Sequence, residues 1–86
     1  MDAEADRMNA LYWLRNYLYY WMTTYKEYNI DMKSKAQIIK IVADGIEWLN
    51  KNSCHAHTED FESQLTEISS GIDAILYGNT KIDEHV

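Results

Sequence analysis

The spacing of large apolar residues near the N-terminus constrains the fold of this chain most strongly. They recur at alternating steps of three and four: Leu11, Leu14, Leu18, Trp21 and Tyr25. This spacing places them on one stripe of an α-helix. No Gly or Pro interrupts residues 5–28. The sequence therefore predicts one long helix over this segment.

A second aromatic stripe follows the same predicted helix, rotated from the first, and it contains Trp13, Tyr17 and Tyr20. A helix that is apolar on two sides must be covered on two sides. Seven aromatic residues fall within the fourteen positions 12–25. They cannot all face one groove, because successive residues of a helix are rotated by about 100°. We expect half of them in the core and assign Trp13, Tyr17 and Tyr20 to a partner interface.

A second helix is predicted from Ser34 to Leu49 or Asn50. The preceding segment 29–33, with its Asn and Asp, favours a turn. Ser34 and Gln37 have the spacing of a capping box, which marks a helix start. Gly45 lies inside this helix and costs about 1 kcal/mol relative to Ala. A close approach of another helix would explain its presence.

A third helix is predicted after a polar connector over residues 51–57, with Thr58 as its N-cap. Its apolar residues again alternate steps of four and three: Phe61, Leu65, Ile68, Ile72 and Ile75. The pair Gly78-Asn79 is a stop signal.

These segments predict an all-α fold, an antiparallel three-helix bundle with a long first helix. Residues 1–79 would form the bundle and residues 80–86 a disordered acidic tail. No segment alternates apolar and polar residues as a strand does. The predicted structural core consists of Leu18, Ile38, Trp48, Leu49, Phe61, Leu65, Ile68 and Ile72.

The charge of the chain bears on its partners. Eight basic residues against fourteen acidic ones give a formal net charge of −6. This balance argues against a nucleic-acid partner, whose phosphates are bound through Lys and Arg. No apolar run reaches the roughly 20 residues of a membrane span. The expectation is a cytoplasmic protein without nucleic-acid or membrane partners.

The segment Cys54-His55-Ala56-His57 is the most chemically suggestive one, because Cys and His are zinc ligands. A structural zinc site needs four ligands, and the only other candidate, His85, lies in the predicted tail. We therefore expect a solvated loop and no metal.

Acidic residues also gather on the third predicted helix: Glu59, Asp60, Glu62, Glu67 and Asp73. Their positions suit a solvated face better than acid–base catalysis, so neither an enzyme nor a cofactor site is expected.

The order of several short motifs resembles one known family. Asn9-Ala10-Leu11 opens the first helix, and the segment 46–50 (IEWLN) closes the second. The segment 59–62 (EDFE) opens the third helix, and Leu76-Tyr77-Gly78 ends it. This order is similar to the C-terminal helical lid of the seventy-kilodalton heat-shock chaperones, the DnaK-type family in its eukaryotic form. The resemblance covers residues 6–78.

The resemblance implies a lid subdomain that closes over peptide held in an adjacent β-sandwich and opens when a separate ATPase domain binds ATP. Its partners would be the rest of the parent chain and, indirectly, unfolded polypeptide clients. The isolated lid could form a homodimer through uncovered aromatic surface. The chain departs from the family at Ser70-Gly71-Ile72, where the family has a Pro step, and at its last four residues, where the cytosolic family has Glu-Glu-Val-Asp. The alternative is a stand-alone helical adapter that presents an aromatic helix to a partner.

Overall fold

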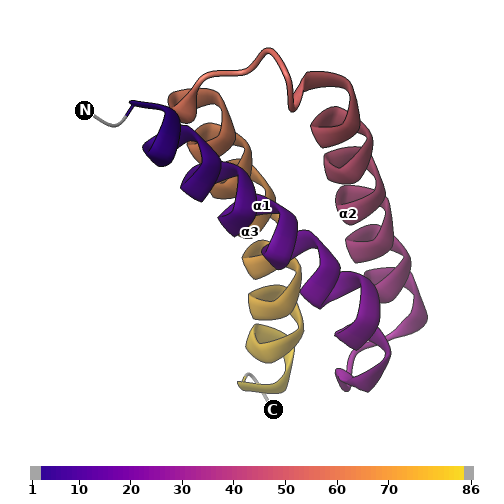
Figure 1. Ribbon diagram of the computed structural model, residues 1–86. Helices are drawn as coiled ribbons and strands as arrows, with labels where there is room; N and C mark the ends of the chain where they lie inside the picture. The colour runs from indigo at the N-terminus through magenta and orange to yellow at the C-terminus, as the bar shows by residue number, and fades with distance from the viewer. Residues whose placement is uncertain (1–2, 85–86) are drawn as a thin grey trace.

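The computed structural model describes the backbone of residues 3–84 and the side chains of residues 4–77. Three α-helices and a short 3₁₀ helix follow one another: α1 (Ala3–Thr24), η1 (Tyr25–Glu27), α2 (Met32–Asn52) and α3 (Thr58–Glu84) (Figure 1). The described residues contain no strand. The predicted all-α, three-helix bundle is confirmed.

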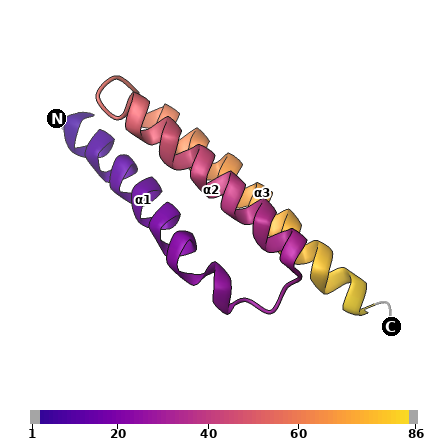
Figure 2. The same ribbon diagram turned by 90° about the vertical axis from the view of Figure 1, so that its right-hand side faces the viewer.

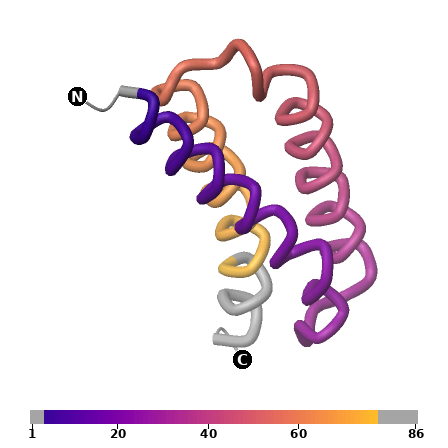
Figure 3. The backbone as a smooth tube through the Cα atoms, viewed as in Figure 1, coloured from indigo at the N-terminus to yellow at the C-terminus, as the bar shows by residue number. Residues whose placement is uncertain are grey.

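Each α-helix packs on the other two. α2 returns alongside α1 after the turn that contains η1, and a loop over residues 53–57 leads into α3 (Figures 2 and 3). α1 contacts both α2 and α3, which also contact each other. α2 and α3 therefore cover the side of α1 that contains Leu14, Leu18 and Trp21, while Trp13 and Tyr20 of the second stripe stay exposed.

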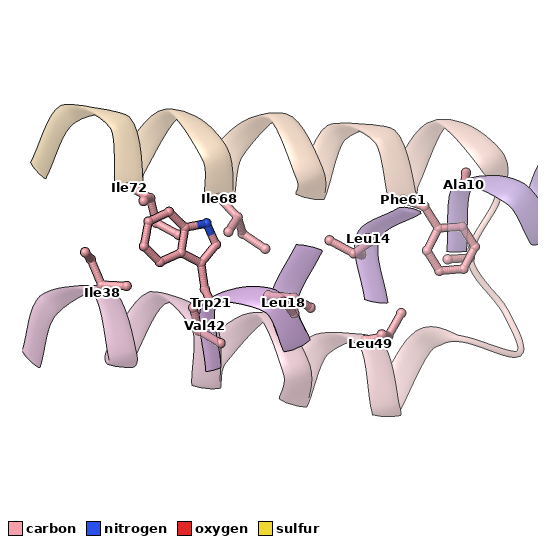
Figure 4. Packing of buried hydrophobic residues seen from close by; sticks show 11 residues of the cluster. Ala10, Leu14, Leu18, Trp21, Ile38, Val42, Leu49, Phe61, Ile68 and Ile72 are labelled. Carbon is pink, nitrogen blue, oxygen red and sulfur yellow. The ribbon is translucent and has the colours of Figure 1, made fainter. Parts of the chain in front are cut away.

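The core is a column of apolar side chains between the three helices. α1 contributes Leu14, Leu18 and Trp21, which point toward residues of α2 and α3 (Figure 4). The buried apolar residues are Ala10, Leu14, Leu18, Trp21, Ile38, Val42, Leu49, Ala56, Phe61, Ile68 and Ile72. Burying a large apolar side chain contributes about 1.5–3 kcal/mol, so this column supplies the main driving force for folding.

Six of the eight residues predicted for the core lie inside this column, and two do not. Trp48 and Leu65 are only half-buried. Trp48 packs edge-on against the ring of Phe61, at 5.8 Å between centroids, and its other side lines a groove between α2 and α3. Leu65 lines a groove between α1 and α3. Both therefore lie at the margins of the core rather than within it.

Gly45 marks the closest approach of α2 to its neighbours. A Cβ atom at this position would lie 2.8 Å from Leu18 Cδ2 and 2.8 Å from Ile68 Cδ1. Real Cβ atoms do not come so close, so only glycine lets α1 and α3 pack here without a shift. The close approach inferred from the sequence is confirmed.

The start of α2 differs from the prediction. The helix begins at Met32, and Asp31 is its N-cap, with a side-chain oxygen that accepts from the Ser34 N–H at 2.9 Å. Ser34 is buried in the first turn and is not the cap. Asp31 prevails because a carboxylate at this position also interacts favourably with the helix dipole. Hydrogen bonds from the Ser34 side chain and, to a smaller extent, from the Ser34 N–H lower the pKa of Asp31 below its ordinary value of 3.8.

The ends of the other helices also shift by a few residues. α1 ends at Thr24 and continues as η1, where one continuous helix to Tyr28 was expected. α3 begins at Thr58, and the N–H of His57 donates to the Asp60 carboxylate at 2.9 Å, so Thr58 is the first helical residue rather than the cap.

The C-terminal end of α3 extends beyond the predicted stop. Its backbone continues past Gly78-Asn79 to Glu84. The predicted acidic tail over residues 80–86 lies outside the residues whose side chains are described.

Candidate interaction surface

The outer sides of α1 expose an unusual set of large apolar side chains, which are Tyr12, Trp13, Tyr19, Tyr20 and Met22. Trp13 is 69% exposed. Single exposed apolar residues are ordinary, but several on one helix mark a surface that another molecule can cover. Two grooves flank this helix, one on each side.

The groove between α1 and α2 has a volume of about 340 Å³. Leu11, Ile46 and Leu49 give it apolar walls. Arg15 and Tyr19 stand at its edge, with the Arg15 guanidinium 5.8 Å from the centre of the Tyr19 ring. This side of α1 therefore offers a cation and an aromatic ring that already interact with each other.

The groove between α1 and α3 has a volume of about 390 Å³. Trp13 and Leu65 line it together with Ala10, and its charged lining residues are Asp6 and Glu62. The two grooves thus differ in charge, because the first contains an arginine and the second contains carboxylates.

The three residues predicted for a partner interface have different surroundings. Trp13 lines the α1–α3 groove, as described above. Tyr20 is 48% exposed, and its hydroxyl lies 2.9 Å from that of Tyr28. Tyr17 is half-buried; burial raises the pKa of its hydroxyl, and nearby Asp73 and Tyr20 raise it further against the opposing effect of Trp21. Trp13 and Tyr20 are thus open to a partner, and Tyr17 is partly withdrawn.

An aromatic cluster closes the end of the bundle near η1. The ring of Trp21 lies 4.7 Å from that of Tyr28 and 5.5 Å from that of Tyr20, measured between centroids. The indole N–H of Trp21 is buried and meets no acceptor in good hydrogen-bond geometry among the described residues; its interaction with the Tyr17 hydroxyl, which lowers the pKa of that group, is at most a poorly aligned bond. The hydrogen bond shared with Tyr20 raises the pKa of the Tyr28 hydroxyl, because it favours the protonated form. Sequence reasoning missed Tyr28, because it lies beyond the end of α1.

A polar clamp closes the opposite end, and it centres on Arg7. Its Nε donates to the carbonyl of Ala56 at 2.8 Å, and its Nη2 donates to the carbonyl of Ser53. The guanidinium also lies 5.6 Å from the centre of the Phe61 ring. Arg7 thereby ties the start of α1 to the loop between α2 and α3. Nothing in the local sequence distinguishes this arginine from a solvated one.

The loop over residues 53–57 does not gather ligands for a metal. Cys54 and His57 are exposed, and Ala56 is buried. Among the described residues, no three His, Cys, Asp or Glu side chains come together as a metal site would require. His85 lies outside those residues. The five acidic residues of α3 within residues 58–77 are exposed, and the Asp60 carboxylate accepts a hydrogen bond from the His57 N–H at the helix start.

None of the described helices combines the length and the apolarity that a membrane crossing needs. In comparisons with known proteins, no family model and no solved structure matches this chain.

Proposed function

We propose that this chain is the lid subdomain of a heat-shock-type chaperone, which closes over peptide bound in an adjacent β-sandwich of the same parent protein. Its action would be mechanical, and the chain itself would need no catalytic residue and no cofactor. Its partners would be the rest of the parent chain and, through it, unfolded polypeptides.

One observation carries this proposal: three of the four segments that resemble the family meet at one end of the bundle, while the fourth, Leu76-Tyr77-Gly78, lies further along α3. Ala10, from the first motif, and Phe61, from the third, lie close together in the core (Figure 4). Trp48, from the second motif, packs edge-on against Phe61. These three motifs, far apart in the sequence, therefore belong to one packing unit, and this supports the proposal.

The contacts between the three helices suit a lid that moves as a rigid body. The Arg7 clamp joins α1 to the loop between α2 and α3, and Gly45 allows all three helices to pack closely. A lid must transmit its motion through such contacts, since a loosely packed bundle would deform instead of lifting.

A second candidate function is a stand-alone interaction module, favoured by the exposure of Trp13 and its aromatic neighbours on α1. Tyr and Trp are enriched at protein interfaces. In this case the partner of α1 would be a separate protein rather than a domain of the same chain.

The reading frame that encodes the chain discriminates between the two candidates. A messenger RNA in which this sequence follows an ATPase domain and a β-sandwich without a stop codon supports the lid. A messenger RNA whose translation starts at Met1 contradicts the lid and favours the module.

A functional test uses a chimera. The native lid of a DnaK-type chaperone is replaced by this chain, and the release of a fluorescent apolar peptide is followed without ATP and with ATP. A lid should slow release relative to the lidless chaperone, and ATP should restore fast release. Release as fast as from the lidless protein, although circular dichroism shows a folded helical bundle, would contradict the proposal.

A further inference from the structure

The groove between α1 and α3 combines an exposed tryptophan with an acidic rim. Trp13 and the half-buried Leu65 provide apolar surface, and Asp6 and Glu62 are the charged residues that line it. An exposed indole beside apolar surface resembles the anchor of a binding site, where Trp is enriched among the residues that dominate affinity.

The two carboxylates are available to a ligand. Neither Asp6 nor Glu62 forms an ion pair or side-chain hydrogen bond within the described part of the chain. The adjacent Arg7 is engaged with the carbonyls of Ser53 and Ala56. Residues 58–77 of α3 include five acidic residues and no Lys or Arg. Arg7 keeps its positive charge, but its ion pair is with Glu4 at 3.5 Å, so both carboxylates of the groove remain without an ion-pair partner among the described residues.

We propose that this groove binds a basic segment of a partner polypeptide, with a Lys or Arg side chain against Trp13 and between the carboxylates of Asp6 and Glu62. The face of an indole attracts a cation. The aliphatic part of a basic side chain can at the same time pack on apolar surface such as Leu65. Each part of the ligand thus has a matching part of the groove.

Charge selects this partner over the alternatives. A second copy of the chain has the same net charge of −6 and would bring like charges together at this groove. A purely apolar partner would leave the two carboxylates facing it without compensation, which costs free energy. The proposal goes beyond the lid and the module alike, because the groove has the same chemistry in either setting.

Binding of a matched pair of synthetic peptides tests the proposal. Both are helical and carry the same Leu residues, but one has Lys and the other Glu at the flanking positions. Calorimetric titration should show binding of the Lys peptide alone, and the affinity should fall as salt is raised. In the NMR spectrum, the indole N–H signal of Trp13 should move, and that of the buried Trp21 should stay in place.

Matched variants locate the binding. Trp13→Ala and Glu62→Lys should each weaken binding of the Lys peptide by about 30-fold or more, as expected at the centre of a binding site. Glu47→Lys makes the same change in net charge on α2, where Glu47 pairs with Lys51 at 3.2 Å. This control should change the affinity less than about threefold, because its distance from the groove leaves only a screened effect.

Several results would overturn the proposal. The first is equal binding of the Lys and Glu peptides, or binding of neither. The second is equal weakening by Glu62→Lys and Glu47→Lys, which would mean that overall charge alone attracts the peptide. The third is a dimer in sedimentation whose formation is abolished by Trp13→Ala, which would assign the groove to a second copy. A negative result here leaves the lid proposal standing, because the chimera measures peptide release instead.

Discussion

The two ends of the bundle are closed by different chemistry. At one end, Arg7 donates hydrogen bonds to loop carbonyls and covers the ring of Phe61. At the other end, Trp21 packs between aromatic rings, and its indole N–H lacks a well-aligned partner among the described residues. The first end satisfies its polar groups, and the second leaves one buried donor unsatisfied.

This difference teaches that burial and polar satisfaction are separate contributions to stability. A buried donor without a partner costs about 1–3 kcal/mol, which offsets part of what the ring gains by leaving water. The Arg7 end has no such cost, because the carbonyl groups of Ser53 and Ala56 accept hydrogen bonds from Arg7. Substitutions at the two ends should therefore differ in effect more than the sizes of the side chains suggest.

The largest effect is expected at the Arg7 end from Phe61→Ala. This change removes a fully buried ring that contacts Trp48 and Arg7, and should lower the free energy of unfolding by about 3–5 kcal/mol. Chemical denaturation measures it. The matched change Trp48→Ala should cost less, because Trp48 is half-buried; equal losses would contradict the placement of Trp48 at the margin.

Gly45→Ala tests the middle of the bundle, between the two ends. The added methyl group meets the side-chain tips of Leu18 and Ile68 at 2.8 Å, and overpacking of this kind costs about 1–3 kcal/mol, of which the higher helix propensity of Ala offsets about 1 kcal/mol. Gly71→Ala is the control, since its methyl group would lie 3.3 Å from the tip of Ile41. Both variants gain the same helix propensity, so the denaturation midpoint of Gly45→Ala should lie clearly below that of Gly71→Ala. Equal midpoints for the two variants would show that the side chains of Leu18 and Ile68 move aside without cost.

Arg7→Met keeps the length of the side chain at the clamp and removes its charge. The loss of hydrogen bonds from a charged donor should cost about 1.5–3 kcal/mol. Arg15→Met, on the exposed side of α1, should stay within about 0.5 kcal/mol. Thermal and urea unfolding give the loss in free energy of unfolding for each variant. Similar losses for Arg7→Met and Arg15→Met would mean that the clamp does not stabilise its end of the bundle.

Trp21→Phe should change stability by less than about 1 kcal/mol, although it alters a buried residue. The smaller ring leaves space, which is unfavourable, but the change also removes the unpaired donor, which is favourable. A urea-unfolding loss of more than about 2 kcal/mol would mean that the indole N–H forms a good hydrogen bond, with the Tyr17 hydroxyl or with a buried water, so that neither end leaves a donor unsatisfied.

The smallest effect concerns Asp31, at the start of α2 near the aromatic end. Its pKa is lowered by the hydrogen bonds from Ser34, so the charged form stabilises the folded state. This contribution is present above the ordinary pKa of 3.8 and is lost as the pH falls through the lower folded value. NMR titration of the carboxyl carbon should give the lowered pKa, and Asp31→Asn should reduce the acid sensitivity of unfolding. A titration at the ordinary value would contradict the cap.

The apolar periodicity was sufficient to predict the three helices and most of the core. Steps of three and four place Leu14, Leu18 and Trp21 on one face whatever the partner helices are. The same reasoning found Gly45, because a glycine inside a helix needs a reason. Periodicity does not tell how deep a residue lies, so Trp48 and Leu65 were expected in the core although they line grooves.

The polar contacts were beyond sequence reasoning for a physical reason. Ser34 was predicted to start the second helix and Asp31 to lie in the turn before it, because only the path of the chain into α2 shows which side chain meets a free N–H. The clamp is harder still, because Arg7 meets Ala56 and Ser53 only after the whole bundle has assembled. In the candidate surface, the exposure of Trp13 was expected, but its neighbours Asp6 and Glu62 come from different helices.

The clamp also orders the events of folding. Arg7 reaches carbonyls that are 46 and 49 positions away in the chain, so both interhelical connections must close before these bonds form. Contacts of such long sequence separation carry a large loop-closure cost and tend to form late. We therefore expect the clamp to lower the unfolding rate of the bundle and to leave its folding rate almost unchanged.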